Sequence, residues 1–158
     1  MPARAVRLLA SAALTLGALG VVSACAREGA ERPLPAACSA GRDRVIEALR
    51  AAPRPVRIDG TPLSACFDRR GNGGDLQAVG ASFVEAASTL SDEAALRPEG
   101  PPARRLGYLV GAAERGAGGA GAPGTNTEIV RRLELELDDV DPGSHALAEG
   151  LRAGRTTG

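Results

Sequence analysis

Aromatic side chains are scarce in this chain of 158 residues, which has two phenylalanines, one tyrosine and no tryptophan. A hydrophobic core must therefore be built from leucine, valine, isoleucine and alanine. Leucine and alanine are strong helix formers. We therefore expect a mainly α fold, a small bundle of four to five short helices.

The charges of the chain balance. Nineteen basic residues, all of them arginine, stand against 19 acidic residues. This provides neither the basic excess of a nucleic-acid-binding protein nor a long acidic block that gathers cations. We expect no nucleic-acid partner and no cofactor, and the length suits one modest domain with accessory segments.

The first residues have the pattern of an export signal. Arg4 and Arg7 precede an uncharged stretch, Leu8 to Val22. This stretch is shorter than the about 20 apolar residues of a membrane-spanning helix. It has the proportions of a secretory signal peptide, so residues 1–24 are expected to be removed from the mature protein.

The stretch ends in Val22-Ser23-Ala24-Cys25. An aliphatic residue, two small residues and a cysteine in this order resemble the lipobox of bacterial lipoproteins. The resemblance implies that the Cys25 thiol carries a diacylglycerol and that the peptide bond before it is cleaved. It thus implies a partner, the outer face of a bacterial cytoplasmic membrane, held by acyl chains that contribute about 0.8 kcal/mol per buried methylene.

A second interpretation stays open at this cysteine. Ala24-Cys25-Ala26 also fits the pattern of an ordinary signal cleavage site. Cleavage there would release a secreted, soluble protein without lipid.

An odd number of cysteines, three, is unusual for an exported protein. If Cys25 carries lipid, Cys38 and Cys66 remain as an even pair in an oxidising compartment, and we predict a disulfide between them. The chain-entropy model gives such a loop about 3.5 kcal/mol of stabilisation. The alternative is a pair of free or buried thiols.

Composition predicts how the mature chain is divided. Residues 25–37 mix charges with Pro33 and Pro35, and are expected to form the lipidated N-terminus and a flexible tether. The helical domain is expected at 38–154, followed by a disordered tail at 155–158. Removal of residues 1–24 leaves 17 arginines against 19 acidic residues, a net charge of −2.

In the first half of the domain, Val45, Ile46 and Leu49 predict one face of a short helix that prolines then stop. Residues 56–60 predict an extended piece and an Asp-Gly turn. Thr61-Pro62 predicts the start of a helix whose inward face carries Cys66.

A longer helix follows. Apolar residues recur every three to four positions from Leu76 to Leu90. Ser91, followed by two acidic residues, predicts a separate short helix that Pro98 ends.

Leu106 to Ala113 is an apolar run in which Gly107 and Gly111 lie four residues apart. Glycines at this spacing form a flat strip on a helix. The run is too short to span a membrane, so we expect two helices of a bundle to approach closely along this strip. Gly116 to Gly124 follows as a flexible loop.

The segment after this loop is ambiguous. Thr125 and Glu128 match a capping box. Within 129–140, alternate leucines fit a strand, but a longer stripe at three to four residues fits a helix, which we favour. Asp141-Pro142 is expected to start a last helix, and Gly154 to close it.

Few groups offer chemistry. Residues 119–125 superficially resemble a phosphate-binding loop but have no lysine. The acidic residues Asp138, Asp139 and Asp141 fit a calcium loop poorly, because the required glutamate is displaced. His145 is the only histidine of the sequence. The chain has no Gly-x-Ser-x-Gly nucleophile motif and no second histidine for a metal site.

Three pairs of adjacent arginines, at 69–70, 104–105 and 131–132, are expected to be solvated, with anionic lipid headgroups as the alternative partner.

The sequence therefore predicts no catalytic, metal-binding or cofactor-binding residue. We expect a non-catalytic interaction or envelope-associated module on a lipid anchor. The alternative is an exported protein that binds a small ligand in a groove between its alanine- and glycine-lined helices. An enzyme is the third and least supported hypothesis.

Overall fold

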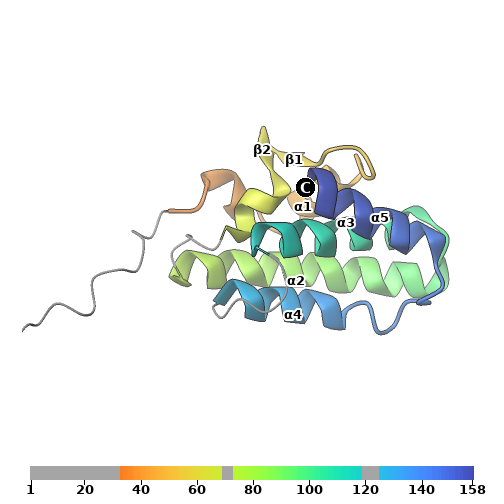
Figure 1. Ribbon diagram of the computed structural model, residues 1–158. Helices are drawn as coiled ribbons and strands as arrows, with labels where there is room; N and C mark the ends of the chain where they lie inside the picture. The colour runs from red at the N-terminus through yellow and green to blue at the C-terminus, as the bar shows by residue number, and fades with distance from the viewer. Residues whose placement is uncertain (1–32, 69–72, 119–124) are drawn as a thin grey trace, which may run out of the picture.

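The computed structural model describes residues 33–68, 73–118 and 125–158, and this part of the chain is a small helical bundle with one disulfide (Figure 1). The mainly α fold predicted from the sequence is thus confirmed. The elements in chain order are the 3-10 helix η1 (Ala36–Ser39), α1 (Arg42–Leu49), β1 (Arg57–Ile58), β2 (Thr61–Pro62), the 3-10 helix η2 (Leu63–Phe67), α2 (Gly73–Leu96), α3 (Pro101–Gly116), α4 (Thr125–Leu135) and α5 (His145–Thr157).

Helix α3 is the centre of the bundle. Every residue from Leu106 to Ala113 is buried, so the helix is covered all round, as an apolar run without charges requires. Helices α2, α4 and α5 and the η2 segment all contact it. In Figure 1, α3 lies between α5 on one side and α2 and α4 on the other.

Helices α2 and α4 pack side by side and run parallel. Near their beginnings, Gly80 lies under the side chain of Ile129. Near their other ends, the Ser91 hydroxyl donates a hydrogen bond of 2.6 Å to the main-chain oxygen of Glu136. Because α3 returns directly after α2, it runs antiparallel to both.

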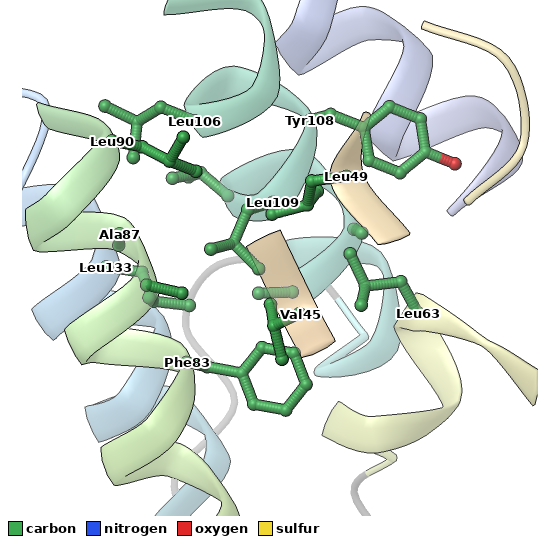
Figure 2. Close-up of a cluster of buried hydrophobic side chains, with 14 of the residues drawn as sticks. Val45, Leu49, Leu63, Phe83, Ala87, Leu90, Leu106, Tyr108, Leu109 and Leu133 are labelled. Carbon is green, nitrogen blue, oxygen red and sulfur yellow. The ribbon is translucent and has the colours of Figure 1, made fainter. Parts of the chain in front are cut away.

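The core is filled by aliphatic side chains with two phenylalanines. Figure 2 shows Val45, Leu49 and Leu63 from the N-terminal segments pointing toward Leu109 of α3 and Phe83 of α2. The Phe67 and Phe83 rings meet edge to face, with centroids 4.8 Å apart. Leu90, Leu106 and Leu133 extend the same core between α2, α3 and α4.

Helices α3 and α5 approach more closely than any side chain would permit. A Cβ atom at Gly107 would lie 2.9 Å from the main-chain nitrogen of Leu151, and one at Gly111 would lie equally close to that of Arg155. The expectation of a close helix contact along these two glycines is therefore confirmed. On the α5 side, Gly150 and Gly154 face the main chain of α3 in the same way.

The short hairpin between α1 and η2 differs in part from the prediction. The Asp59-Gly60 turn is present, with φ of 47° and 83°, as a tight hairpin turn requires. However, Thr61 pairs with Ile58 in the sheet, so Thr61-Pro62 forms a strand and does not cap a helix. The following element is a 3-10 helix, although Cys66 does point inward as expected.

Helix α2 was expected to end before Ser91, and this was wrong. It is continuous to Leu96, because Ser91 is buried against α4 and its hydroxyl bonds to Glu136 instead of capping a new helix. The interpretation of 129–140 as a helix holds as far as Leu135, after which residues 136–140 form turns.

Helix α5 begins later and ends later than predicted. Its N-cap is Ser144, whose hydroxyl accepts the Leu147 N–H, whereas Asp141 accepts the Gly143 N–H in the preceding turn. Residues 155–158, predicted as a disordered tail, continue the helix to Thr157 and bury Gly158. This end is held because the Ser64 hydroxyl donates a 2.6 Å hydrogen bond to the Gly158 main-chain oxygen.

The folded domain also begins before the predicted boundary at residue 38. Leu34 and Ala37 already pack against the core, and Ala36–Ser39 forms η1. The predicted tether at 25–37 is therefore too long at its C-terminal end.

Candidate functional site

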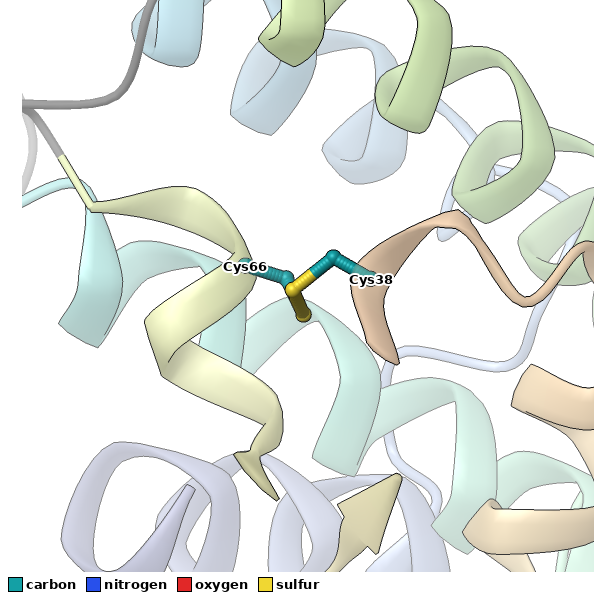
Figure 3. Close-up of a disulfide and its surroundings, with 2 residues drawn as sticks. All are labelled: Cys38 and Cys66. Atoms are coloured by element: carbon teal, nitrogen blue, oxygen red, sulfur yellow. A yellow bond between two sulfur atoms is a disulfide. The ribbon is translucent and has the colours of Figure 1, made fainter. Parts of the chain in front are cut away.

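The predicted disulfide between Cys38 and Cys66 is present (Figure 3). It joins η1 to η2, with Cα atoms 5.4 Å apart, and both residues are fully buried. The burial of Cys66 follows from η2, which packs against the end of α3: a Cβ atom at Gly116 would lie 2.9 Å from that of Phe67. The bond thus ties the start of the fold to the central helix.

Cys25, the predicted lipidation site, lies outside the described residues. It is the one cysteine of the sequence that the disulfide does not use. The described chain starts at Pro33, eight residues after Cys25, and enters the core at Leu34. Whatever group Cys25 carries is therefore close in sequence to the disulfide.

The contact between the glycine-lined faces of α3 and α5 leaves no groove between these two helices. Main-chain atoms of the two helices fill the space that side chains would occupy, as the 2.7 Å from a Cβ atom at Gly154 to the Ala112 nitrogen shows. On α5, Gly150 and Gly154 face the strip of α3 in the same way. Their spacing of four is visible in the sequence, where Gly154 also has the signature of a helix end.

The described residues do form an open depression elsewhere, with a volume of about 390 Å³. It lies at the beginning of α1 and is lined by Ala40, Gly41, Arg42, Asp43 and Glu85. Arg42 is paired with Asp43 at 2.8 Å, which raises the Arg42 pKa through the hydrogen bond and the charge of Asp43. The depression is thus a polar surface feature and not an apolar pocket.

The three aspartates that fit the pattern of a calcium loop only poorly all lie on the surface. Asp138, Asp139 and Asp141 are exposed, and Asp141 accepts the main-chain N–H of Gly143 at 2.8 Å. Within the described ranges, no group of three or more histidine, cysteine or acidic side chains is arranged to hold a metal ion.

His145 is exposed at the first position of α5. Its main-chain N–H donates to one carboxylate oxygen of Glu99 at 3.0 Å, and that of Ala146 donates to the other at 3.2 Å. The carboxylate suits this position because it meets the unpaired N–H groups and the positive end of the helix dipole. Glu99 therefore assists Ser144 in fixing the start of α5.

Two of the arginine pairs lie in the described part of the chain, and three of their four members form ion pairs with glutamates. Arg104 forms an ion pair of 2.5 Å with Glu149, which joins α3 to α5. Arg131 and Arg132 both bond to Glu128 and lower its pKa to about 2, chiefly through the Arg131 hydrogen bond. The pair at 69–70 lies outside the described residues, as does the loop at 119–124 that resembled a phosphate site.

One buried polar group is unexplained. The side-chain nitrogen of Asn126, in the first turn of α4, is buried and has no hydrogen-bond partner in the described structure. Asn126 lies shortly after residues 119–124, which are outside the described ranges, and the sequence pattern assigns it no role.

Among the described helices, none is both long and apolar enough to cross a membrane. Comparison of the chain with protein-family models, with curated proteins and with solved structures gives no match.

Proposed function

We propose that this chain is a bacterial lipoprotein whose helical domain is a non-catalytic interaction module on the outer face of the cytoplasmic membrane. The observation that carries the proposal is the assignment of the cysteines. The disulfide uses Cys38 and Cys66, so Cys25 is left for another role, and it stands directly after an apolar stretch and two small residues.

The start of the fold suits an anchor at Cys25. Since Leu34 already packs against the core, only residues 26–33 separate the lipid from the domain. Eight extended residues span at most about 28 Å, so the domain would be held close to the bilayer. Because the disulfide joins η1 to η2, a force on the tether would also act on η2 and α3, and not on η1 alone.

The non-catalytic part of the proposal is supported by where the candidate groups lie. Asp141 accepts the Gly143 N–H in the turn before α5, and Glu99 accepts the main-chain N–H of His145 at the beginning of that helix. Tyr108 is buried, and its hydroxyl accepts the Val56 N–H at 3.0 Å. The hydrogen bonds of these groups therefore join parts of the fold to one another.

The anchor is tested by the intact mass and membrane partition of the chain expressed in a bacterium. We expect a mass larger than that of residues 25–158 by a diacylglycerol, and recovery with the membrane. Cys25→Ser should remove both, whereas the neighbouring Ala26→Ser serves as the matched control and should keep both. A wild-type mass equal to its amino acids alone would establish the secreted alternative.

The interaction role needs a separate test. Lipidated protein in native membranes should give a discrete crosslinked band that Cys25→Ser loses and Ala26→Ser keeps. The crosslinked partner is then identified by mass spectrometry, and its absence at several reagent lengths would contradict an interaction module.

A further inference from the structure

The charges of the mature chain are unevenly divided between two segments and the remainder. Residues 92–99 and 134–141 together hold eight carboxylates and one arginine, Arg97, a net charge of −7. The rest of residues 25–158 holds 16 arginines against 11 carboxylates, a net charge of +5. We call these two segments the acid-rich end.

The structure brings the two segments together at one end of the bundle. The Ser91 hydroxyl bonds to Glu136, the Ser144 hydroxyl donates to the Pro98 oxygen at 2.5 Å, and Glu99 caps α5. The chain from α4 to α5 thus runs beside the last turn of α2. Figure 1 shows this end on the right, where α2 finishes and the connection to α5 turns back.

The described chain begins at the other end. Cys38 in η1 is bonded to Cys66 in η2, and η2 packs on Gly116 at the far end of α3. In Figure 1, η1 accordingly lies on the left, near the beginning of α2. Helix α2 has 24 residues, so it separates the two ends by about 36 Å.

We infer that a lipid-anchored domain stands on an anionic bilayer with its acid-rich end directed away from the lipid. This inference rests on the proposed anchor at Cys25. Phospholipid surfaces with net negative charge attract arginines and repel carboxylates within a Debye length, about 8 Å at physiological salt. The two ends of the bundle are separated by several Debye lengths. The electrostatic potential of the bilayer therefore acts on whichever end lies at the lipid and hardly on the other end.

The orientation determines which surface other proteins meet. The acid-rich end carries two exposed leucines, Leu96, which is 84% exposed, and Leu135, which is 52% exposed. An anchored domain therefore presents carboxylates with exposed leucine toward solution, while the η1 end faces the headgroups.

The absence of tryptophan from the sequence permits a direct test in the full lipidated chain. Single variants Leu96→Trp, at the acid-rich end, and Ser39→Trp, at the exposed side of η1, provide one donor each. Energy transfer to a dansyl headgroup lipid is measured in phosphatidylcholine vesicles with and without about one third phosphatidylglycerol. Only protein that floats with the vesicles is measured.

We expect transfer from Leu96→Trp to fall at least about two-fold when phosphatidylglycerol is added, and to recover in about 0.5 M NaCl. Transfer from Ser39→Trp should stay high throughout. The variant Asp138→Asn/Asp139→Asn should weaken the response to lipid charge. Equal transfer from both positions, or no response of Leu96→Trp to lipid charge, would overturn the orientation while leaving the anchor intact; protein that does not float would overturn both.

Discussion

Gly154 of α5 packs directly on the main chain of Tyr108 in α3, where a Cβ atom would overlap the Tyr108 carbonyl oxygen. The contact joins two parallel helices whose main chains touch over three turns. It places α5 close enough for the Tyr108 hydroxyl to lie 3.1 Å from that of Thr157. The absence of a side chain at this position is therefore a condition for the whole α3–α5 pair.

Gly154→Ala tests this condition. The added methyl group meets main-chain atoms of both Tyr108 and Ala112, which cannot rotate away, so α5 must shift. We expect a loss of about 3 kcal/mol in the free energy of unfolding, measured by urea denaturation. Gly73→Ala is the matched control, since a Cβ atom there has only an ordinary contact of 3.7 Å with Thr125, and it should be neutral or slightly stabilising. Equal effects of the two variants would contradict the close contact.

Tyr108→Phe removes one oxygen and leaves the ring. The buried Val56 N–H then loses the acceptor that it has at 3.0 Å, and no water reaches a fully buried residue. We expect a loss of about 1–3 kcal/mol in urea denaturation. Thr157→Ala removes the other partner of the hydroxyl but leaves Val56 paired, and should cost less than about 0.5 kcal/mol. A reversed order of the two losses would show that Val56 does not depend on Tyr108.

The helical class, the disulfide and the close contact along Gly107 and Gly111 of α3 could be predicted, because each follows from composition, cysteine count or residue spacing. The ends of the helices could not be predicted in this way. Ser91 has the sequence signature of a cap, but its hydroxyl is taken by Glu136, which lies 45 residues away in the chain. Gly154 has the signature of a helix end, but it is required by Tyr108. In both cases a long-range contact overrides a local preference.

Long-range contacts also explain why the C-terminal boundary of the domain could not be predicted from the sequence. Residues 155–158 have no apolar side chain, and nothing local predicts that they are ordered. Their place is set by distant groups: Arg115 donates to the main-chain oxygens of Arg155 and Thr156, and Ser64 donates to that of Gly158. The candidate functional residue, Cys25, was identified from its neighbours alone, and the fold contributes only that the other two cysteines are paired.

Glu128 should give the stability a pH dependence in strong acid. Its folded pKa is lowered from 4.5 to about 2 by hydrogen bonds from Arg131 and then Arg132. A lowered folded pKa means that the contribution is fully present above about pH 4.5 and is lost as the pH falls toward 2. Glu128→Gln should therefore be slightly less stable than wild type at pH 7 and equal to it at pH 2. High salt should shrink the difference, because the pair is exposed. An NMR titration with a midpoint near 4.5 would contradict the pairing.

The disulfide should contribute more than any single contact among the N-terminal segments. Cys38 and Cys66 are 28 residues apart, and closing such a loop restricts the unfolded chain by about 3.5 kcal/mol in the entropy model. We expect Cys38→Ser/Cys66→Ser to lose stability of this order in urea, and to match reduced wild type. Because Cys25 lies before the folded domain, Cys25→Ser should leave the same transition unchanged. If the double variant unfolds at the urea concentration of oxidised wild type, then η1 and η2 are held by packing alone, and the bond has no part in fixing the tether to the core.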